Sequence, residues 1–297
     1  MRVFLTGAGG FIGRHTLHAL ATAGHEVLAL ERDRPVEGGP CEVLRGDLAD
    51  LGSIRDILQR WRPEACIHLA WYVEPGVYLD SADNVAMLQQ SLELLQVLLE
   101  TGCRQVVTAG TCAEYDAEAG WLREGGPTRP ETLYAACKLS LGEVGRQMAL
   151  AAGVRLSHVR IFYPYGPGED RRRMVPALAL ALLGGQAFPA SHGLQVRDYI
   201  HVGDVAEGLR VLAEAGAEGI YNVASGAPVT VRGLMETVGE IAGGGHLIRF
   251  GEKPPRKWEP PFIGGDPSRL RALGWAPKRA LHEGLAETVD WWRGNAD

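Results

Sequence analysis

Two patterns of apolar residues alternate along the chain. Short, almost continuous apolar runs are typical of strands buried on both faces, whereas longer segments repeat apolar residues every three or four positions, as helices do. The runs predict strands at residues 3–5, 26–30, 41–47, 65–70, 105–109 and 157–162. The helical pattern covers residues 14–23, 53–61, 84–100, 133–152 and 282–292. Because strands and helices alternate, we predict an α/β fold with a doubly wound parallel sheet.

Length and composition fit a globular protein. A chain of 297 residues can bury a large core, and it suits one large domain or two modest ones. Apolar residues make up 46% of it and charged residues 22%, as in soluble proteins. The net charge of −6 argues against nucleic acid as a partner, because nucleic-acid-binding surfaces carry a basic excess.

The cysteines, the start of the first strand and the lengths of the apolar segments bear on where in the cell the protein is located. The five cysteines include no C-x-x-C pair, so they indicate neither a disulfide framework nor a metal site. The first strand begins at residue 3, which leaves no room for a signal peptide, and no segment reaches the roughly 18 apolar residues of a membrane span. We therefore expect a cytoplasmic protein without a membrane partner.

The first strand runs directly into a glycine cluster, Gly7, Gly10 and Gly13, and a helix follows. Glycines permit a tight turn, and the free N–H groups at a helix N-terminus attract a phosphate. The sequence thus predicts a dinucleotide site that includes Phe11 and Ile12. An ordinary glycine-rich turn is the alternative. The T-G-x-x-G-x-x-G spacing differs from the usual G-x-G-x-x-G fingerprint and resembles the short-chain dehydrogenase/reductase superfamily.

The end of the second strand bears on the choice of cofactor. Glu31 stands where a dinucleotide-binding unit places the residue that meets the adenosine ribose. A carboxylate there accepts hydrogen bonds from both ribose hydroxyls and repels a 2′-phosphate, which favours NAD. Arg32 and Arg34 follow, however, and a guanidinium could pair with the 2′-phosphate of NADP.

The superfamily resemblance implies further cofactor contacts along the chain. It implies that Asp47 caps the adenine amino group. It also implies that the strand ending in H-L-A passes under the cofactor, with His68 packed inside the strand. The other residues in this predicted contact set are Leu48, Leu69, Ala70, Asn84 and Phe162.

Three residues are the candidates for chemistry. Tyr134 and Lys138 form the Y-x-x-x-K motif of the superfamily, and on a helix they lie on one face. The lysine cation stabilises a tyrosine phenolate and can also hold the nicotinamide ribose. Thr111, at the end of a neighbouring strand, supplies a hydroxyl for the substrate oxygen. Any one of these patterns occurs by chance, but the combination with the glycine cluster indicates catalysis.

Downstream segments make the resemblance specific. R-I-F-Y-P-Y-G-P-G at residues 160–168 and R-D-Y-I-H-V at 197–202 resemble the extended NAD-dependent epimerase/dehydratase family, which acts on nucleotide-activated sugars. The resemblance implies that Arg197 and Arg256 bind the substrate diphosphate, and guanidinium groups pair well with phosphate oxygens. It implies that Phe188 stacks on the base. Surface ion pairs are the alternative for both arginines.

The family resemblance also implies a domain plan. We expect a Rossmann-type dinucleotide-binding domain over residues 1–163, to which residues 199–226 return. A smaller, interleaved α+β substrate-binding lobe would then comprise residues 164–198 and 227–297. No repeat or low-complexity linker separates the two.

Departures from the family pattern bear on the reaction. Cys112 and Ala113 stand where sugar dehydratases carry an Asp-Glu pair, so a 4,6-dehydratase is not expected. Tyr163 replaces an Asn that relatives use on the substrate phosphate. These features favour a 4-ketoreductase acting on a nucleotide 4-keto-6-deoxysugar. The alternatives are a C4 epimerase with tightly bound NAD and a non-catalytic NAD-binding sensor.

The helix at residues 84–100 has too wide an apolar stripe for one buried face. One face should contact the sheet and the other a partner helix. We therefore predict a homodimer in which this helix and the helix at 133–152 form a four-helix bundle with their symmetry mates.

Overall fold

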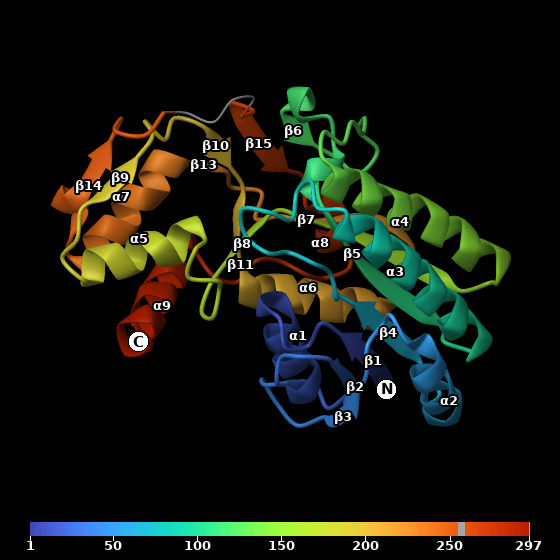
Figure 1. The fold of residues 1–297 in the computed structure, drawn as a ribbon. Coiled ribbons are helices and arrows are strands. Elements are labelled where there is room, and N and C mark those ends of the chain that lie inside the picture. Colours follow the sequence, from blue (N-terminus) through green and yellow to red (C-terminus); the bar gives the residue numbers. More distant parts are fainter. Residues whose placement is uncertain (255–258, 297) are drawn as a thin grey trace.

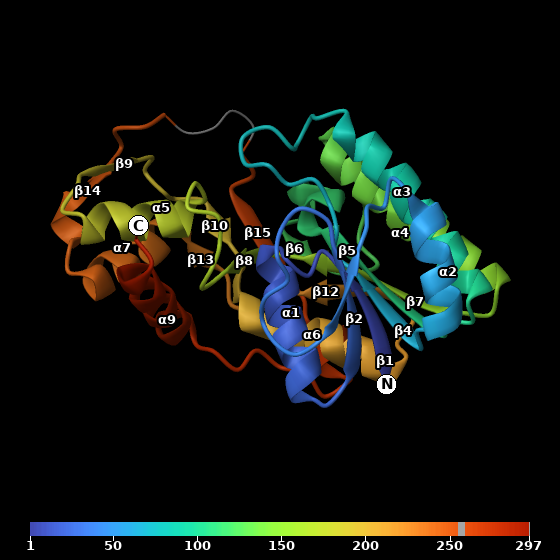
Figure 2. The same cartoon turned by 60° about the horizontal axis from the view of Figure 1, so that its bottom comes forward.

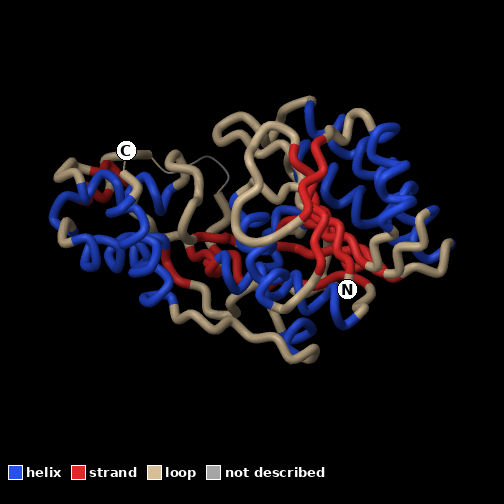
Figure 3. The backbone as a smooth tube through the Cα atoms, turned by 90° about the horizontal axis from the view of Figure 1, so that it is seen from below, coloured by secondary structure: helices blue, strands red, loops and turns tan. Residues whose placement is uncertain are grey.

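The core of the structure is a seven-stranded parallel sheet with the strand order β12-β7-β5-β4-β1-β2-β3. Most of its strands are labelled in Figure 1, and Figure 3 shows the strands in red among the helices. This computed structural model describes residues 1–254 and 259–296. The strands are β1 Arg2–Thr6, β2 Glu26–Glu31, β3 Glu42–Arg45, β4 Ala65–His68, β5 Gln105–Thr111, β7 Arg155–Ile161 and β12 Gly219–Val223. The order runs outward in both directions from β1 and β4. The prediction of a doubly wound α/β fold is confirmed.

Helices cover both faces of this sheet (Figure 2). On one face lie α1 (Phe11–Thr22) and α6 (Val202–Ala215), and on the other lie α2 (Leu51–Trp61), α3 (Asp83–Glu100) and α4 (Leu133–Ala151). Alternate residues of β1 therefore serve different cores: Val3 and Leu5 pack on the first side and Phe4 on the second. Each such side chain, fully buried, stabilises the fold by about 1.5–3 kcal/mol.

Helix α3 uses its broad apolar surface within the chain. Leu94, Leu95 and Leu98 belong to the core on the α2 side of the sheet, and α3 also packs side by side with α4 (Figure 1). The sheet and α4 thus cover part of the two faces of this helix that were predicted to be buried. Val85 on α3 and Val144 on α4 nevertheless stay 43% and 44% exposed.

The start of α1 differs from the prediction. The helix begins at Phe11, three residues before the expected start at Arg14. The Gly10 N–H donates to the Gly7 carbonyl (3.0 Å), and the Arg14 N–H already donates to the Gly10 carbonyl (3.1 Å). Gly10 therefore belongs both to the glycine turn and to the first turn of the helix.

A second group of elements packs beside the main sheet, at the left of Figure 1. Its helices are α5 (Met174–Leu183), α7 (Val231–Ala242) and α9 (Leu281–Gly294), which enclose a separate apolar core. A two-stranded sheet, β9 (Phe188–Ala190) with β14 (Ile248–Phe250), lies beside them. The arrangement is compatible with the proposed division at residues 163–164, 198–199 and 226–227, which remains a proposal.

Small sheets join the two groups. One consists of β13 (Val229–Thr230), β10 (Val196–Arg197), β15 (Phe262–Gly265) and β6 (Trp121–Leu122). Another pairs β8 (Tyr163–Tyr165) with β11 (Tyr199–His201) in parallel. The remaining elements are α8 Ser268–Arg271 and the 3₁₀ turns η1 Cys112–Glu114, η2 Ala117–Ala119 and η3 Gly245–Leu247. Because strands from distant segments share these sheets, the two groups are interleaved.

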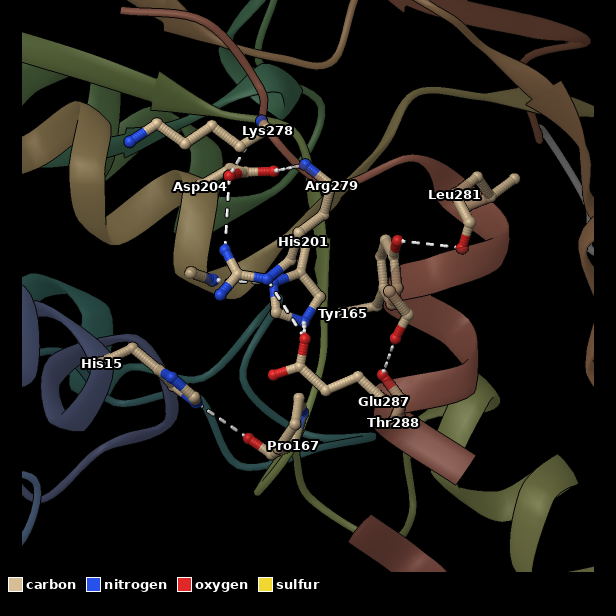
Figure 4. A network of polar contacts seen from close by, with 12 residues as sticks. His15, Tyr165, Pro167, His201, Asp204, Lys278, Arg279, Leu281, Glu287 and Thr288 are labelled. Atoms are coloured by element: carbon tan, nitrogen blue, oxygen red, sulfur yellow. Dashed lines mark hydrogen bonds and ion pairs between the residues drawn. The ribbon is translucent and has the colours of Figure 1, made fainter. Parts of the chain in front are cut away.

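A polar network fixes the C-terminal segment to the rest of the fold (Figure 4). The buried carboxylate of Asp204 on α6 accepts hydrogen bonds from the backbone N–H groups of Lys278 (3.1 Å) and Arg279 (3.2 Å). Beside it, the His201 ring packs edge to face against Tyr165, with centroids 5.5 Å apart. The network thereby sets where α9 begins.

Over the described part of the chain, no helix has both the length and the apolar character needed to cross a membrane.

Candidate active site

The predicted glycine turn forms a tightly packed cradle at the end of β1. Gly7 has φ +73°, and a Cβ there would lie 2.7 Å from the Ala70 backbone nitrogen. A Cβ at Gly13 would lie 2.0 Å from the Gly7 carbonyl oxygen. Side chains are excluded at both positions, so the backbone of Leu69–Ala70 approaches the turn closely.

The N-terminus of α1 has donors available for an anion. Its N-cap, Gly10, offers no side-chain hydrogen bond, and the first turn contains no acidic residue. The Nε of Arg14 is buried and has no hydrogen-bond partner in the part of the chain that the structure describes. Unfilled N–H groups, a positive helix end and the unpaired Nε of the half-buried Arg14 fit the pyrophosphate of a dinucleotide.

The ribose end of this site is ordered by its own ion pairs. Glu31, the last residue of β2, accepts a hydrogen bond from the Val36 N–H (3.0 Å) and pairs with Arg45 (3.3 Å). Arg32 pairs with Asp33 at 2.6 Å on the surface. A carboxylate at the strand end and a neutralised Arg32 fit NAD better than NADP.

Residues 47 and 48, predicted to lie near the adenine, follow β3. The Asp47 carboxylate accepts the Ala49 N–H at 2.9 Å, which fixes the turn before α2. Leu48 is buried in the core on the α2 side of the sheet. Their contacts with the adenine stay predictions.

The three predicted catalytic residues lie together. Thr111 ends β5, and its side chain lies close enough to Tyr134, at the start of α4, to lower the pKa of that phenol. Lys138, one turn further on, donates from Nζ to the Ala109 carbonyl at 2.7 Å. Its Nζ lies 6.0 Å from the centre of the Tyr134 ring. A hydroxyl, a phenol and an amine therefore converge at the carboxyl end of β5, where parallel α/β sheets bind ligands.

Burial shifts the pKa values of the two ionisable groups in opposite directions. It lowers the pKa of Lys138 to about 7, against the opposing effect of the Glu114 carboxylate. It raises the pKa of Tyr134, with smaller contributions from Tyr78 and Glu114, while the nearby side chain of Thr111 lowers it. Phenolate formation thus depends on positive charge supplied close to Tyr134.

A loop over residues 71–82 covers the catalytic pair, and two of its aromatic residues were not predicted as site residues. The Trp71 ring lies 3.8 Å from the Nζ of Lys138, and Tyr78 packs edge to face on Tyr134 with centroids 4.9 Å apart. The aromatic character of the loop was the available signal, but simple packing accounted for it equally well. The loop's own backbone adds to the cover, since the Tyr134 N–H donates to the Leu79 carbonyl.

Asn84 anchors this loop from the first turn of α3. Its side-chain oxygen accepts the indole N–H of Trp71 (2.9 Å), and its amide donates to the carbonyls of Tyr78 (2.6 Å) and Ser81 (2.9 Å). The side chain is fully buried. The predicted contact of Asn84 with the cofactor stays a prediction, and the structure adds this anchoring role.

On the substrate side, Arg197 is buried beside Tyr163. Its guanidinium carbon lies 5.7 Å from the centre of the Tyr163 ring, and Nη2 pairs with Glu259 at 3.2 Å. A buried guanidinium paired with a single, partly exposed carboxylate is suited to exchange that partner for a phosphate. The second predicted arginine, Arg256, lies outside the described residues.

The remaining predicted contacts are positioned by neighbouring strands. Phe162, buried just after β7, packs so closely that a Cβ on Gly265 would lie 2.5 Å from its ring. Phe188 lies on β9 in the second group of elements, with the Lys253 amine 5.5 Å from its ring centre.

Asp198 was not predicted as a site residue. Its buried carboxylate accepts hydrogen bonds from three backbone N–H groups, of Ser225, Gly226 and Gly265, and from the Ser225 hydroxyl. It thereby fixes the strand that carries Arg197.

Comparisons with known proteins agree with this geometry. The family model described as "NAD dependent epimerase/dehydratase family" matches residues 3–224. The UDP-glucose 4-epimerase of Azospirillum brasilense is 29% identical, over 98% of this chain and 91% of its own length. The Thermus thermophilus UDP-glucose 4-epimerase in complex with NAD superposes with a TM-score of 0.87 at 31% identity, covering 99% of each chain. The Thermotoga maritima enzyme with UDP-glucose gives 0.88 at 25%, covering 100% of each chain.

The matched segment carries the glycine cradle, the Tyr134–Lys138 pair and Arg197. It spans about three quarters of the chain. The chain is therefore an NAD-dependent enzyme of the epimerase/dehydratase family, within the extended short-chain dehydrogenases/reductases.

Proposed function

We propose that this enzyme is a nucleotide-sugar 4-epimerase that keeps NAD bound through the reaction. The convergence of Thr111, Tyr134 and Lys138 at the carboxyl end of β5 supports oxidation and reduction at a sugar carbon, which epimerases and ketoreductases share. The observation that favours epimerisation is the similarity to UDP-glucose 4-epimerases. The 4-ketoreductase predicted from the sequence has no comparable support.

The proposed mechanism assigns each side chain one task. NAD, held by the glycine cradle and the N-terminus of α1, would accept the C4 hydrogen as hydride and return it. Tyr134, as the phenolate, accepts the proton of the sugar 4-hydroxyl, and Thr111 holds the same oxygen by a hydrogen bond. The charge on Lys138 stabilises the phenolate. After the 4-keto sugar has turned its other face to the cofactor site, Tyr134 returns the proton to the oxygen.

Dehydration lacks the groups it needs. A 4,6-dehydratase requires a general acid and a base beyond the tyrosine, and the two residues after Thr111 are Cys112 and Ala113. Burial raises the pKa of the Cys112 thiol to about 12, which leaves it protonated at neutral pH. Cys112 therefore offers no base, and dehydration does not suit this site.

The substrate class in this proposal is a nucleoside diphosphate sugar. Arg197 is the diphosphate ligand, and Glu259 is the partner that it exchanges on binding. Arg256 and Phe188 complete the proposed set, for the second phosphate contact and the base. A UDP-sugar is the first candidate, because UDP-glucose is bound by the similar Thermotoga maritima enzyme.

Product analysis without added cofactor tests the proposal. The purified enzyme is incubated with UDP-galactose, UDP-N-acetylglucosamine and dTDP-glucose in turn, and the sugars are separated after hydrolysis. We expect one pair of C4 epimers to approach equilibrium, with no change in nicotinamide absorbance. If the enzyme instead oxidises NADPH while it reduces a nucleotide 4-keto-6-deoxysugar, and epimerises none of the sugars, the result would favour the ketoreductase.

A further inference from the structure

Two neighbouring residues of the loop at 71–82 contact Tyr134. The Tyr78 ring packs edge to face on the Tyr134 ring, with centroids 4.9 Å apart and an angle of 83° between the planes. The Tyr134 N–H donates to the Leu79 carbonyl at 2.9 Å. The first N–H groups of a helix have no partner within it, and Tyr134 is the second residue of α4. The loop therefore holds both the backbone and the ring of Tyr134.

Tyr78 is itself held from two sides. From α3, the Asn84 side-chain amide donates to the Tyr78 carbonyl at 2.6 Å. From the other side, Arg173, the N-cap residue of α5, places its guanidinium carbon 5.1 Å from the centre of the Tyr78 ring. A cation over an aromatic face is attracted by the ring. The backbone of Tyr78 is thus fixed by α3, and its ring by the start of α5.

A second contact joins the same loop to the segment before α5. Glu74 in the loop forms an ion pair with Arg172, whose guanidinium also donates to Asp170 at 2.9 and 2.6 Å. The Arg172 side chain is half exposed, and ion pairs of exposed side chains contribute little, because solvent screens them. The contact between Arg173 and Tyr78 is therefore the one that we expect to matter for Tyr134.

We propose that Tyr78 is a positioning residue for the reaction proposed above: its ring holds the Tyr134 phenol in place for proton transfer, and Arg173 holds the Tyr78 ring. The proposal rests on the role proposed for Tyr134. A helical side chain leans over the preceding turn, but α4 begins at Leu133, so no earlier turn of the helix supports Tyr134. The Tyr78 ring supplies this support. A misplacement of about 1 Å in a reacting group can cost about 100-fold in rate.

Substitutions at position 78 test the role of the ring. We expect Tyr78→Ala to lower kcat about tenfold and to change the KM of the nucleotide sugar less than about threefold, because the phenol is misplaced while the substrate contacts remain. Tyr78→Phe keeps the ring and should restore kcat to within about twofold of wild type. Val77→Ala changes the exposed neighbour in the same loop and should leave kcat unchanged. Equal losses in the two Tyr78 variants, or no loss in either, would overturn the proposal.

A double-mutant cycle tests the link to α5. Arg173→Met should lower kcat about threefold in the wild-type enzyme and cause no further loss in Tyr78→Ala, because Arg173 acts through the Tyr78 ring. Arg171→Met is the matched control: it removes a guanidinium two residues earlier, which donates to the Ala296 carbonyl, and should leave kcat unchanged. Independent losses at positions 173 and 78 would contradict the link. So would a rise in KM alone, since it would mean that Arg173 binds the substrate.

NMR measures the packing of Tyr134 without a sugar substrate. The chain has eight tyrosines, so tyrosine labelled with ¹³C at the ring carbons next to the hydroxyl gives a small set of signals, and Tyr134→Phe identifies the one of interest. Spectra are recorded on the purified full-length enzyme with its cofactor as isolated. We expect the Tyr134 signal to shift in Tyr78→Ala, which lacks the neighbouring ring current, and to stay near its wild-type position in Tyr78→Phe. An unchanged signal in Tyr78→Ala would show that the ring does not hold Tyr134. A failure of the proposed epimerisation is detected separately, as absent turnover by the wild-type enzyme.

Discussion

The amine of Lys138 is held between the Ala109 carbonyl oxygen, 2.7 Å away, and the face of the Trp71 ring, 3.8 Å away. A cation over an indole face in a desolvated site gains about 2 kcal/mol. The ring is fixed in turn by the hydrogen bond from its N–H to Asn84. The loop that covers the site therefore takes part in holding the lysine in place.

This contact predicts a graded response to substitution at position 71. Trp71→Ala should lower kcat about tenfold, because it removes the ring that holds the Lys138 amine. Trp71→Phe keeps an aromatic face and should lose less than about threefold. Steady-state kinetics on both variants provide the test. Equal losses in the two variants would show that the hydrogen bond to Asn84 matters and the ring face does not.

Removing the phenol should stop the chemistry and leave the cofactor in place. We expect Tyr134→Phe to lower kcat by about 10³, within the range contributed by a positioned proton-transfer group. NAD affinity, measured by calorimetry, should change less than about threefold. Turnover within tenfold of wild type would remove Tyr134 from the mechanism.

Glu31 should select NAD over NADP. Its carboxylate lies at the end of β2 and repels a 2′-phosphate, whereas Arg32 already pairs with Asp33. We expect NADH to bind at least tenfold more tightly than NADPH, a difference of about 1.4 kcal/mol, in fluorescence titrations. Tighter binding of NADPH would mean that Arg32 leaves Asp33 to bind the phosphate.

His201 should make the fold sensitive to acid. Burial lowers its pKa from 6.5 to about 3, with Arg279 and His15 acting in the same direction, so its 3.6 Å contact with Glu287 is not an ion pair at neutral pH (Figure 4). The unfolded chain binds the proton more tightly, so the stability contributed by neutral His201 is present above pH 6.5 and is lost as the pH falls toward 3.

The size of this effect can be isolated by comparison with His201→Gln. Between pH 7 and pH 5 the free energy of unfolding of the wild-type protein should fall by about 2 kcal/mol more than that of the variant. Urea unfolding at the two pH values measures both. Equal losses in the two proteins would mean that His201 is protonated in the fold.

The homodimer remains a prediction. Val85 on α3 and Val144 and Leu150 on α4 stay 43%, 44% and 66% exposed, which leaves an apolar surface on the proposed bundle. Sedimentation at micromolar concentration should give a dimer, and Val144→Glu should weaken it more than the same change at Leu194, which lies outside both helices and is 71% exposed. A wild-type monomer would contradict the prediction.

The sequence predicted the parallel sheet and the Thr111, Tyr134 and Lys138 set because both depend on local patterns: period, glycine spacing and a four-residue step along one helix. It did not predict Trp71, Tyr78 or Asp198. Each of these acts through a partner distant in the sequence, such as Lys138 for Trp71 or Gly265 for Asp198. No local pattern distinguishes a buried carboxylate that orders a site from one on the surface.

Local patterns also could not decide which reaction the enzyme catalyses. The residues that epimerases and ketoreductases share are visible in the sequence, so the motif alone left the choice open. Whether hydride returns to the molecule it left is a property of cofactor retention and sugar movement, and neither has a residue signature in this chain.

The fate of the C4 hydrogen tests the central claim most directly. A nucleotide sugar epimerised by the enzyme is prepared with deuterium at C4 and incubated without added cofactor, and the product is analysed by NMR and mass spectrometry. We predict that the product retains deuterium at C4 with inverted configuration and acquires none at other carbons. Loss of the label to solvent or to exogenous NAD would contradict epimerisation by hydride return within one site.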